Sequence, residues 1–334
     1  MLIDLVPVWT LILGLAVFMY VLLDGFDLGV GILFPFAPGE GARDLMMHSV
    51  APIWDGNETW LVLGGIGLFA AFPLAFAIIV PASYFPILFM LLGLIFRGVA
   101  FEFRMKAGRS RLLWDRAFFW GSLVATYAQG IVLGSFVQGY RVSGRQFAGT
   151  AFDWARPFPL IVGLALVFGY ALLGATWLVA KTEGALQQWA RRKARLAVIA
   201  VVLSLAAVSV WTPLLAPSIA QRWFSWPNIA WLAPVPLACA ATAAWLWHAL
   251  YTDREATPFF AAMGMFLTGY AGLAISVWPN IVPHVISLWD AASSAKAQAF
   301  LLIGTLFLLP IIVAYTGWSY YVFRGKVRAD AGYH

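Results

Sequence analysis

Nine long apolar runs limit the folds open to this chain more than any other feature of its sequence. A helix needs roughly 20 apolar residues to cross about 30 Å of hydrocarbon, and lipid tolerates only structures whose backbone groups are internally bonded. The runs cover residues 8–34, 59–72, 74–101, 114–137, 158–180, 194–215, 229–250, 258–278 and 299–323. We therefore expect an all-α integral membrane protein with nine transmembrane helices in one bundle domain, residues 1–334.

The second run is short, so we expect its helix to begin before Trp60, with residues 54–59 as its first turns. Pro73, Pro81 and Pro86 predict a break and kinks around the second and third runs. Together these runs correspond to about 64 Å of helix, which suits two crossings and not three.

The overall composition agrees with a membrane protein. Charged residues make up 11% of the chain, against about 25% in a typical soluble domain. The single cysteine, Cys239, excludes an intramolecular disulfide. The first residues lack the basic segment and the small-residue cleavage site of a signal peptide, so we expect the first run to be retained as a helix.

The basic residues of the connecting segments predict the orientation. With nine crossings, 13 of them fall on one side and 5 on the other. The larger group comprises Arg104, Lys106, Arg109, Arg111, Arg116, Lys181, Arg191, Arg192, Lys193, Arg195, Arg324, Lys326 and Arg328, and the smaller comprises Arg141, Arg145, Arg156, Arg222 and Lys296. Basic loops stay in the cytoplasm, so we expect the N-terminus outside and the C-terminus in the cytoplasm.

Two acidic pairs lie where the first and second helices meet the predicted cytoplasmic side. Asp24 and Asp27 form one pair, and Asp55 and Glu58 form the other. A spacing of three puts both members of a pair on one helix face. Ionisable groups at this depth are costly and face a protein interior or water. The four acids therefore predict a proton path that begins at the cytoplasmic side.

A structural reading of the same acids stays open. Asp24 and Asp27 would then cap or bridge a helix broken at Gly25, and Asp55 would stabilise the following helix N-terminus. The two readings are not exclusive.

Other polar residues favour structural roles. Arg97 is expected to pair with Glu58 or Glu102, with snorkelling toward the interface as the simplest account. Trp54 and Asn57 are assigned to the same structural polar cluster. Asp290 is expected to be a helix N-cap, with Ser293 and Ser294 close by. Gln129 and Gln138 are expected to bond a neighbouring helix, with a quinone carbonyl as the alternative.

The histidines argue against a haem held by this chain alone. A haem within a helix bundle needs axial ligands, usually histidines, at a workable depth. His48, His248, His284 and His334 fall in loops, at a helix end or at the C-terminus, so we expect no two of them to face each other. One cysteine is too few for zinc or iron–sulfur sites. We expect no catalytic, cofactor-binding or metal-binding residue in this chain.

Five stretches carry a resemblance to a known family. They are Asp24-Gly-Phe-Asp-Leu-Gly-Val-Gly31, Ala51-Pro-Ile-Trp-Asp-Gly-Asn-Glu-Thr-Trp60, Phe96-Arg-Gly-Val-Ala-Phe-Glu-Phe-Arg104, Trp289-Asp-Ala-Ala-Ser-Ser294 and Pro310-Ile-Ile-Val-Ala-Tyr-Thr316. Over nearly its whole length the chain resembles subunit II of cytochrome bd-type quinol oxidases. The compact stretch at residues 216–228 resembles the cyanide-insensitive branch of that family.

The resemblance implies a haem-free subunit of an aerobic respiratory oxidase in the bacterial cytoplasmic (inner) membrane. Its partner, subunit I, would carry haem b and haem d, oxidise quinol and reduce oxygen to water, making the reaction electrogenic without pumping. The family places the aspartate that matches Asp55 in a cytoplasmic proton path, with Asp24 and Asp27 in the adjacent stretch. Some members also hold a structural quinone in subunit II. The implied partners are subunit I, quinol, lipid and small accessory subunits, and no nucleic acid.

Two other functions remain as alternatives. A proton-coupled secondary transporter would often show inverted repeats around a midplane site, whereas the acids here gather at one side of the first half. A purely structural scaffold subunit would need the acids for assembly but not for turnover.

Overall fold

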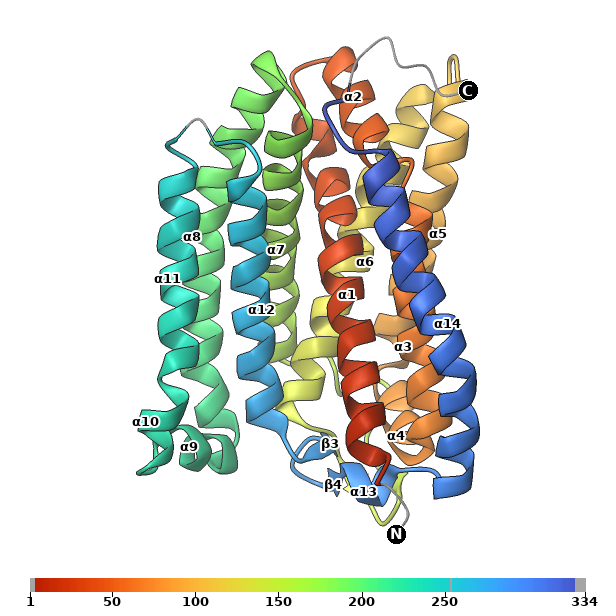
Figure 1. Ribbon diagram of the computed structural model, residues 1–334, viewed down its shortest axis with the longest axis vertical. Coiled ribbons are helices and arrows are strands. Elements are labelled where there is room, and N and C mark those ends of the chain that lie inside the picture. The colour runs from red at the N-terminus through yellow and green to blue at the C-terminus, as the bar shows by residue number, and fades with distance from the viewer. Residues whose placement is uncertain (1–3, 253, 328–334) are drawn as a thin grey trace.

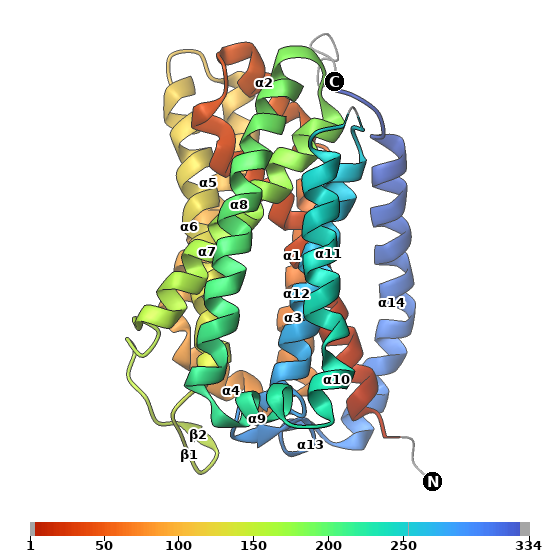
Figure 2. The same cartoon turned by 90° about the vertical axis from the view of Figure 1, so that its left-hand side faces the viewer.

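The structure, a computed structural model, describes residues 4–252 and 254–327. It is an elongated bundle of helices with roughly aligned axes and small β-hairpins at one end (Figures 1 and 2). The chain begins at the hairpin end, and its last helix finishes at the opposite end, the end at which α2 (Glu40–Val50) also lies (Figure 1). We call these the hairpin end and the α2 end.

Eight helices within the described residues are long and apolar enough to cross a membrane. They are α1 (Val6–Leu33, followed by the 3-10 turn η1, Phe34–Phe36), α5 (Tyr84–Lys106), α6 (Arg111–Gln138), α7 (Pro157–Lys181), α8 (Gly184–Leu215), α11 (Pro234–Ala249, preceded by α10, Asn228–Leu232), α12 (Thr257–Val277) and α14 (Ala295–Val322). The remaining helices are α2 (Glu40–Val50), α3 (Trp54–Ala71), α4 (Pro73–Ala82), α9 (Pro217–Phe224) and α13 (Leu288–Ala291). The two hairpins pair β1 (Val142–Ser143) with β2 (Gln146–Phe147) and β3 (Asn280–Val282) with β4 (Ile286–Ser287). The expected multi-pass helical fold is confirmed.

The second and third apolar runs differ partly from expectation. The second forms α3, which begins at Trp54 as the sequence predicts. The third is not one helix over 74–101, because the chain breaks at Ser83 between α4 and α5. Pro86 has no N–H to donate to the Ala82 carbonyl, so the α-helical bonding cannot continue through this turn.

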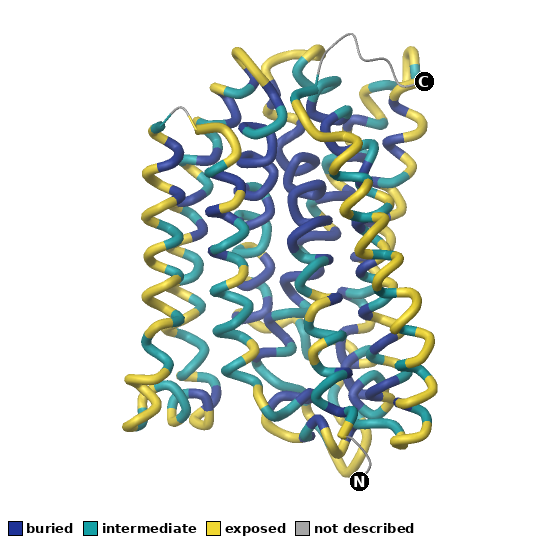
Figure 3. The backbone as a smooth tube through the Cα atoms, in the orientation of Figure 1, coloured by how far each residue is buried: buried dark blue, intermediate teal, exposed yellow. Residues whose placement is uncertain are grey.

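Helix α1 lies at the centre of the buried part of the bundle and packs against α3, α6 and α7. Its closest approach is to α7, where Gly29 meets Gly174. A Cβ on Gly29 would lie 1.8 Å from the Tyr170 carbonyl oxygen, so only glycine allows this approach. Burial is concentrated on α1 and α7 in the half nearest α2 (Figure 3).

Several helices expose most of their surface. In the most apolar stretches of α14 and of α10–α11, 6% of the residues are buried. Helix α14 runs along one edge of the bundle (Figure 2), on the opposite side from α8 and α11 (Figure 1). Such apolar surfaces suit contact with lipid or with another membrane protein.

Candidate functional site

The candidate site is a buried polar cluster where α1, α3 and α5 meet, in the half of the bundle nearest α2. Helix α1 contributes Tyr20, Asp24 and Asp27, which its 3.6-residue period places on one face. Both carboxylates are fully buried. The helix continues through Gly25, so the two acids do not cap a break there, and that expectation was wrong. Gly25 instead allows the ring of Tyr170 to pack closely.

Arg97 comes from α5 and is also fully buried. Its guanidinium forms an ion pair with Asp24, and Nη2 lies 3.2 Å from Glu58 Oε1. The guanidinium carbon also lies 5.3 Å from the centre of the Trp54 ring, which adds a cation–π contact. The snorkelling expected for Arg97 was therefore wrong, because its partners hold the charge inside. Breaking a buried ion pair by removing one partner costs about 3–5 kcal/mol.

Asn57 connects three helices at this site. Its Nδ2 donates to Asp27 Oδ2 at 2.7 Å and to the Leu23 carbonyl at 3.2 Å, both on α1. The Tyr320 hydroxyl of α14 donates to Asn57 Oδ1 at 3.0 Å. The side chain of Asn57, which is itself on α3, therefore fixes the position of the Asp27 carboxylate relative to α3 and α14.

A chain of hydrogen bonds extends the cluster to α6 and α7. Gln129 Nε2 donates to the Tyr20 hydroxyl at 2.7 Å, and the Tyr170 hydroxyl donates to Gln129 Oε1 at 2.9 Å. Tyr20 lies on the same face of α1 as Asp24, which links this chain to the acids of the cluster. The expectation that Gln129 bonds neighbouring helices is confirmed. The two tyrosines were missed, although Tyr20 precedes Asp24 by four residues, one helical turn.

Two aspartate oxygens of the cluster have no hydrogen-bond partner among the described residues. Asp24 Oδ2 and Asp27 Oδ1 are buried and accept no hydrogen bond from the described residues. Buried polar atoms normally have a partner, and a carboxyl oxygen can accept a hydrogen bond or carry a proton. Each aspartate thus has one oxygen held by protein groups and one free for water or a proton.

The four sequence-predicted acids differ in their access to the surface. Asp24 and Asp27 are fully buried, and the Glu58 side chain is 26% exposed. Asp55 lies in the first turn of α3 on an exposed surface. Glu102 is exposed as well, and Arg97 pairs with Asp24 and Glu58 rather than with it. The acids therefore form a series from the exposed Asp55 through Glu58 to the two buried aspartates.

A second ionic network, which sequence reasoning missed, fastens α2 to α5 and α6. Arg104 is 1% exposed, and it donates to Asp44 at 2.7 Å and to Asp115 at 2.5 Å. Arg111 also donates to Asp44. Burial acts to raise the pKa of Asp44, but the hydrogen bonds from the two arginines outweigh it and lower that pKa. Arg104 follows Arg97 by two helical turns, a spacing that could have indicated a shared buried face.

Asp290 lies far from this cluster, at the hairpin end. It is inside α13, where its backbone N–H donates to the Ser287 hydroxyl at 3.1 Å. Ser294 is the residue that caps α14, by accepting from the Ala297 N–H at 3.3 Å. The expectation that Asp290 is an N-cap was therefore wrong.

Within residues 4–252 and 254–327, no group of three or more His, Cys, Asp or Glu side chains could hold a metal ion. His48 lies on α2, His248 on α11 and His284 between β3 and β4, so these three are on separate elements. His334 lies outside the described residues.

The chain was compared with known families and curated proteins. A family model described as cytochrome bd terminal oxidase subunit II matches residues 5–323. The chain is 28% identical to cytochrome bd-I ubiquinol oxidase subunit 2 of Escherichia coli K12, over 97% of this chain and 95% of that protein. It is 27% identical to cytochrome bd ubiquinol oxidase subunit 2 of Bacillus subtilis, over 96% of each.

Solved structures give the same answer for the fold. A chain from the structure of bd oxidase from Geobacillus thermodenitrificans superposes with a TM-score of 0.75 at 19% identity, covering 96% of this chain and 99% of that one. At this identity the match is evidence of a shared fold, while the family model covers nearly the whole sequence. The chain belongs to the subunit II family of cytochrome bd terminal oxidases.

Proposed function

We propose that this chain is the haem-free subunit of a bd-type quinol:oxygen oxidoreductase and supplies its partner with protons from the cytoplasm. The partner, subunit I, would carry haem b and haem d, oxidise quinol and reduce oxygen to water. The names of the Escherichia coli and Bacillus subtilis relatives, both ubiquinol oxidase subunits, support this reaction class. The complex would lie in the bacterial cytoplasmic membrane.

The arrangement of Asp24, Asp27, Glu58 and Arg97 is the observation that carries the proton-path proposal. Three carboxyl groups share this site with one guanidinium, so the fully ionised cluster would have a net charge of −2. Unpaired charge away from water is costly, and binding a proton removes it. The series from the exposed Asp55 to the buried aspartates offers a route by which that proton arrives.

We further propose that the α2 end faces the cytoplasm. Helix α3, continued by α4, runs from the α2 end toward the hairpin end (Figure 1), so α3 and α4 would form a ninth crossing beside the eight long helices. The basic connections after α5 and α7 lie at the α2 end, and basic loops stay in the cytoplasm. The acid cluster would then be reached from inside the cell.

The test uses the intact complex with Asp27→Asn and Glu58→Gln, which keep the size of each side chain. If both acids carry protons, oxygen consumption per haem should fall at least about tenfold in each variant, since a positioned proton-transfer group contributes on the order of 10²-fold or more. Haem content and yield of the complex should stay near wild type, because Arg97 keeps Asp24 as its ion-pair partner.

Glu102→Gln is the matched control, since Glu102 is an exposed acid on the helix that carries Arg97. It should leave oxygen consumption unchanged. Normal turnover in both Asp27→Asn and Glu58→Gln would contradict the proton path. Reduced assembly with normal turnover per assembled complex would instead favour the scaffold function.

A further inference from the structure

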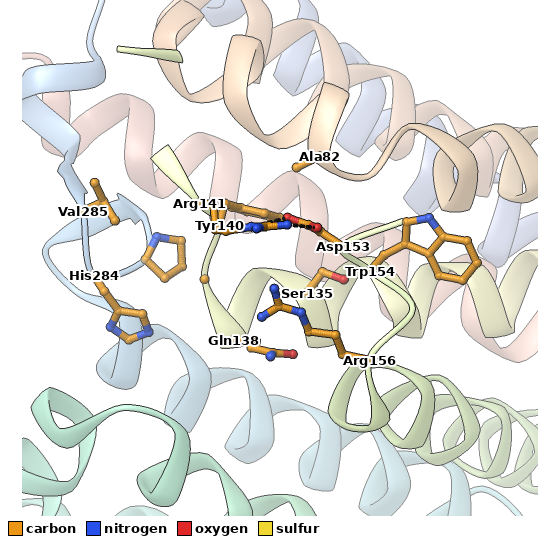
Figure 4. A pocket seen from close by; sticks show the side chains of 12 residues that line it. Ala82, Ser135, Gln138, Tyr140, Arg141, Asp153, Trp154, Arg156, His284 and Val285 are labelled. Carbon is orange, nitrogen blue, oxygen red and sulfur yellow. Dashed lines mark hydrogen bonds and ion pairs between the residues drawn. The ribbon is translucent and has the colours of Figure 1, made fainter. Parts of the chain in front are cut away.

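A cavity of about 260 Å³ lies at the hairpin end, the end opposite the one nearest the acid cluster. It is bounded by the end of α6, the segment that leads into α7 and the β3–β4 hairpin (Figure 4). Its polar lining includes Ser135, Gln138, Arg141, Asp153 and Arg156. Drug-sized ligand pockets begin at roughly 300 Å³, so this cavity suits a small polar group.

The cavity lining carries one uncompensated positive charge. Arg141 donates two hydrogen bonds to the Asp153 carboxylate, one of them from Nε at 2.8 Å. These bonds lower the pKa of Asp153, which keeps it ionised, so the charges of this pair cancel. The Arg156 guanidinium makes no ion pair with any residue of the described chain, and it extends beside Ser135 and Gln138 (Figure 4).

Two neutral polar groups face the same space without a protein partner. Ser135 is 6% exposed, and its hydroxyl has no hydrogen bond to any described residue. The same holds for Oε1 of Gln138, one helical turn further along α6. Since buried polar atoms are normally paired, these groups indicate a polar occupant next to Arg156.

His284 forms part of the cavity wall, and both of its ring nitrogens already have protein partners. Its two ring nitrogens lie 3.3 Å from the Val137 carbonyl oxygen and 3.3 Å from the Ser218 hydroxyl. Its backbone has a φ of 68°, a conformation that is uncommon outside glycine. Residues keep such a backbone conformation where the surrounding structure holds them in place. We therefore assign His284 a structural role in the wall and do not count it among the residues that bind the occupant.

The surroundings of the cavity have the character of a membrane–water interface. Trp154 lines it, and the neighbouring Phe152 is 65% exposed and stacks on Phe85 of α5. Aromatic side chains of this kind gather at the level of lipid head groups. The positively charged cavity therefore lies where phosphate groups are concentrated.

We propose that this cavity binds a phosphate group, held by the Arg156 guanidinium together with Ser135 and Gln138. Guanidinium binds phosphate through parallel charge-assisted hydrogen bonds, and the two neutral groups complete the site. A phospholipid head group and free phosphate share this chemistry. The proposal concerns the opposite end of the bundle and does not depend on the proton path.

The experiment measures thermal unfolding of the detergent-purified, delipidated complex with three additives in turn. They are dioleoyl phosphatidylglycerol, dioleoylglycerol (which lacks the phosphate) and sodium phosphate. We expect phosphatidylglycerol to raise the unfolding temperature and dioleoylglycerol to have no effect. In Arg156→Gln the concentration of phosphatidylglycerol needed for half of the shift should rise at least about tenfold, a loss equivalent to about 1.4 kcal/mol.

The matched control is Arg145→Gln, because Arg145 is an exposed arginine of the β1–β2 turn at the same end that does not line the cavity. It should respond like wild type, and Ser135→Ala should weaken the response as Arg156→Gln does. A shift with sodium phosphate alone that is lost in Arg156→Gln would also support the site, with free phosphate as its source. Equal responses of Arg156→Gln and Arg145→Gln, or stabilisation by dioleoylglycerol, would overturn the proposal.

Discussion

At the residue scale, the rotation of α3 decides which acids join the cluster. The buried residues of α3 are Asn57, Trp60, Gly64, Gly67 and Ala71, at alternating spacings of three and four. Asp55 precedes Asn57 by two residues, or about 200° around the helix, so it points outward. Glu58 is about 100° from Asn57 and lies at the boundary.

The spacing of the acids was therefore enough to predict that each pair shares a face, but not how α3 is rotated. That rotation depends on the packing of Trp60 and two glycines against neighbouring helices. Arg97 shows the same limit. Its burial requires carboxylates and an aromatic ring from two other helices. The local sequence of α5 does not indicate which residues of other helices will contact Arg97.

His48, on α2 outside the membrane-spanning helices, gives a prediction for pH. Burial lowers its pKa, opposed by Asp44 and assisted by Arg104. An unfolded histidine takes up a proton below about pH 6.5, whereas native His48 resists it. The contribution of His48 to the free energy of unfolding is therefore fully present above about pH 6.5. It is lost as the pH falls from there toward the lowered pKa of the native histidine. Asp44 keeps its charge in this range, because its own pKa is lowered.

We expect the unfolding temperature of the complex to fall between pH 7.5 and pH 5.5, and to fall less in His48→Gln. Thermal unfolding at several pH values measures this. His248→Gln, at an exposed position on α11, is the control and should keep the wild-type slope. An identical slope in His48→Gln would show that this histidine does not link protonation to stability.

At the element scale, helix positions were predictable because each apolar run must cover the same thickness of lipid. The break at Ser83 was not placed, because three prolines in a short stretch allow several kinks and tertiary packing selects among them. The contact between α1 and α7 was also beyond prediction. It depends on Gly29 facing Gly174, and a glycine shows its role only once its neighbour is known.

The α1–α7 contact gives a prediction for Gly29→Ala. The added methyl would collide with backbone atoms of α7, which cannot rotate away as a side chain can. Overpacking costs about 1–3 kcal/mol and more where backbone must move, so yield and unfolding temperature of the complex should drop clearly. Gly65→Ala on α3 is the control, since a Cβ there meets nothing within 4 Å. Equal stability of the two variants would contradict the close helix approach.

At the scale of the whole molecule, polar chemistry is divided between the two ends of the bundle. The α2 end holds the acids of the cluster and the Arg104 network, and the hairpin end holds the cavity at Arg156. The charge bias of the connecting loops predicts which end is cytoplasmic, but one of its contributors, Arg328, lies outside the described residues. Because the two sites lie at opposite ends of the bundle, the orientation decides from which side of the membrane each one is reached.

Two connections separated by one crossing can test that orientation. Gly108 lies between α5 and α6, and Gly144 lies in the β1–β2 turn after α6, and a side chain at either position would meet open space. We expect a fluorescent protein inserted at Gly108 to fluoresce and alkaline phosphatase inserted there to be inactive, with the reverse at Gly144. Green fluorescent protein becomes fluorescent in the cytoplasm, and alkaline phosphatase becomes active outside it. The two insertion positions should therefore give opposite results, and each serves as the control for the other. The opposite pattern would place the acid cluster toward the outside and remove the basis for cytoplasmic proton uptake, because Asp55 and Glu58 would then face the wrong compartment.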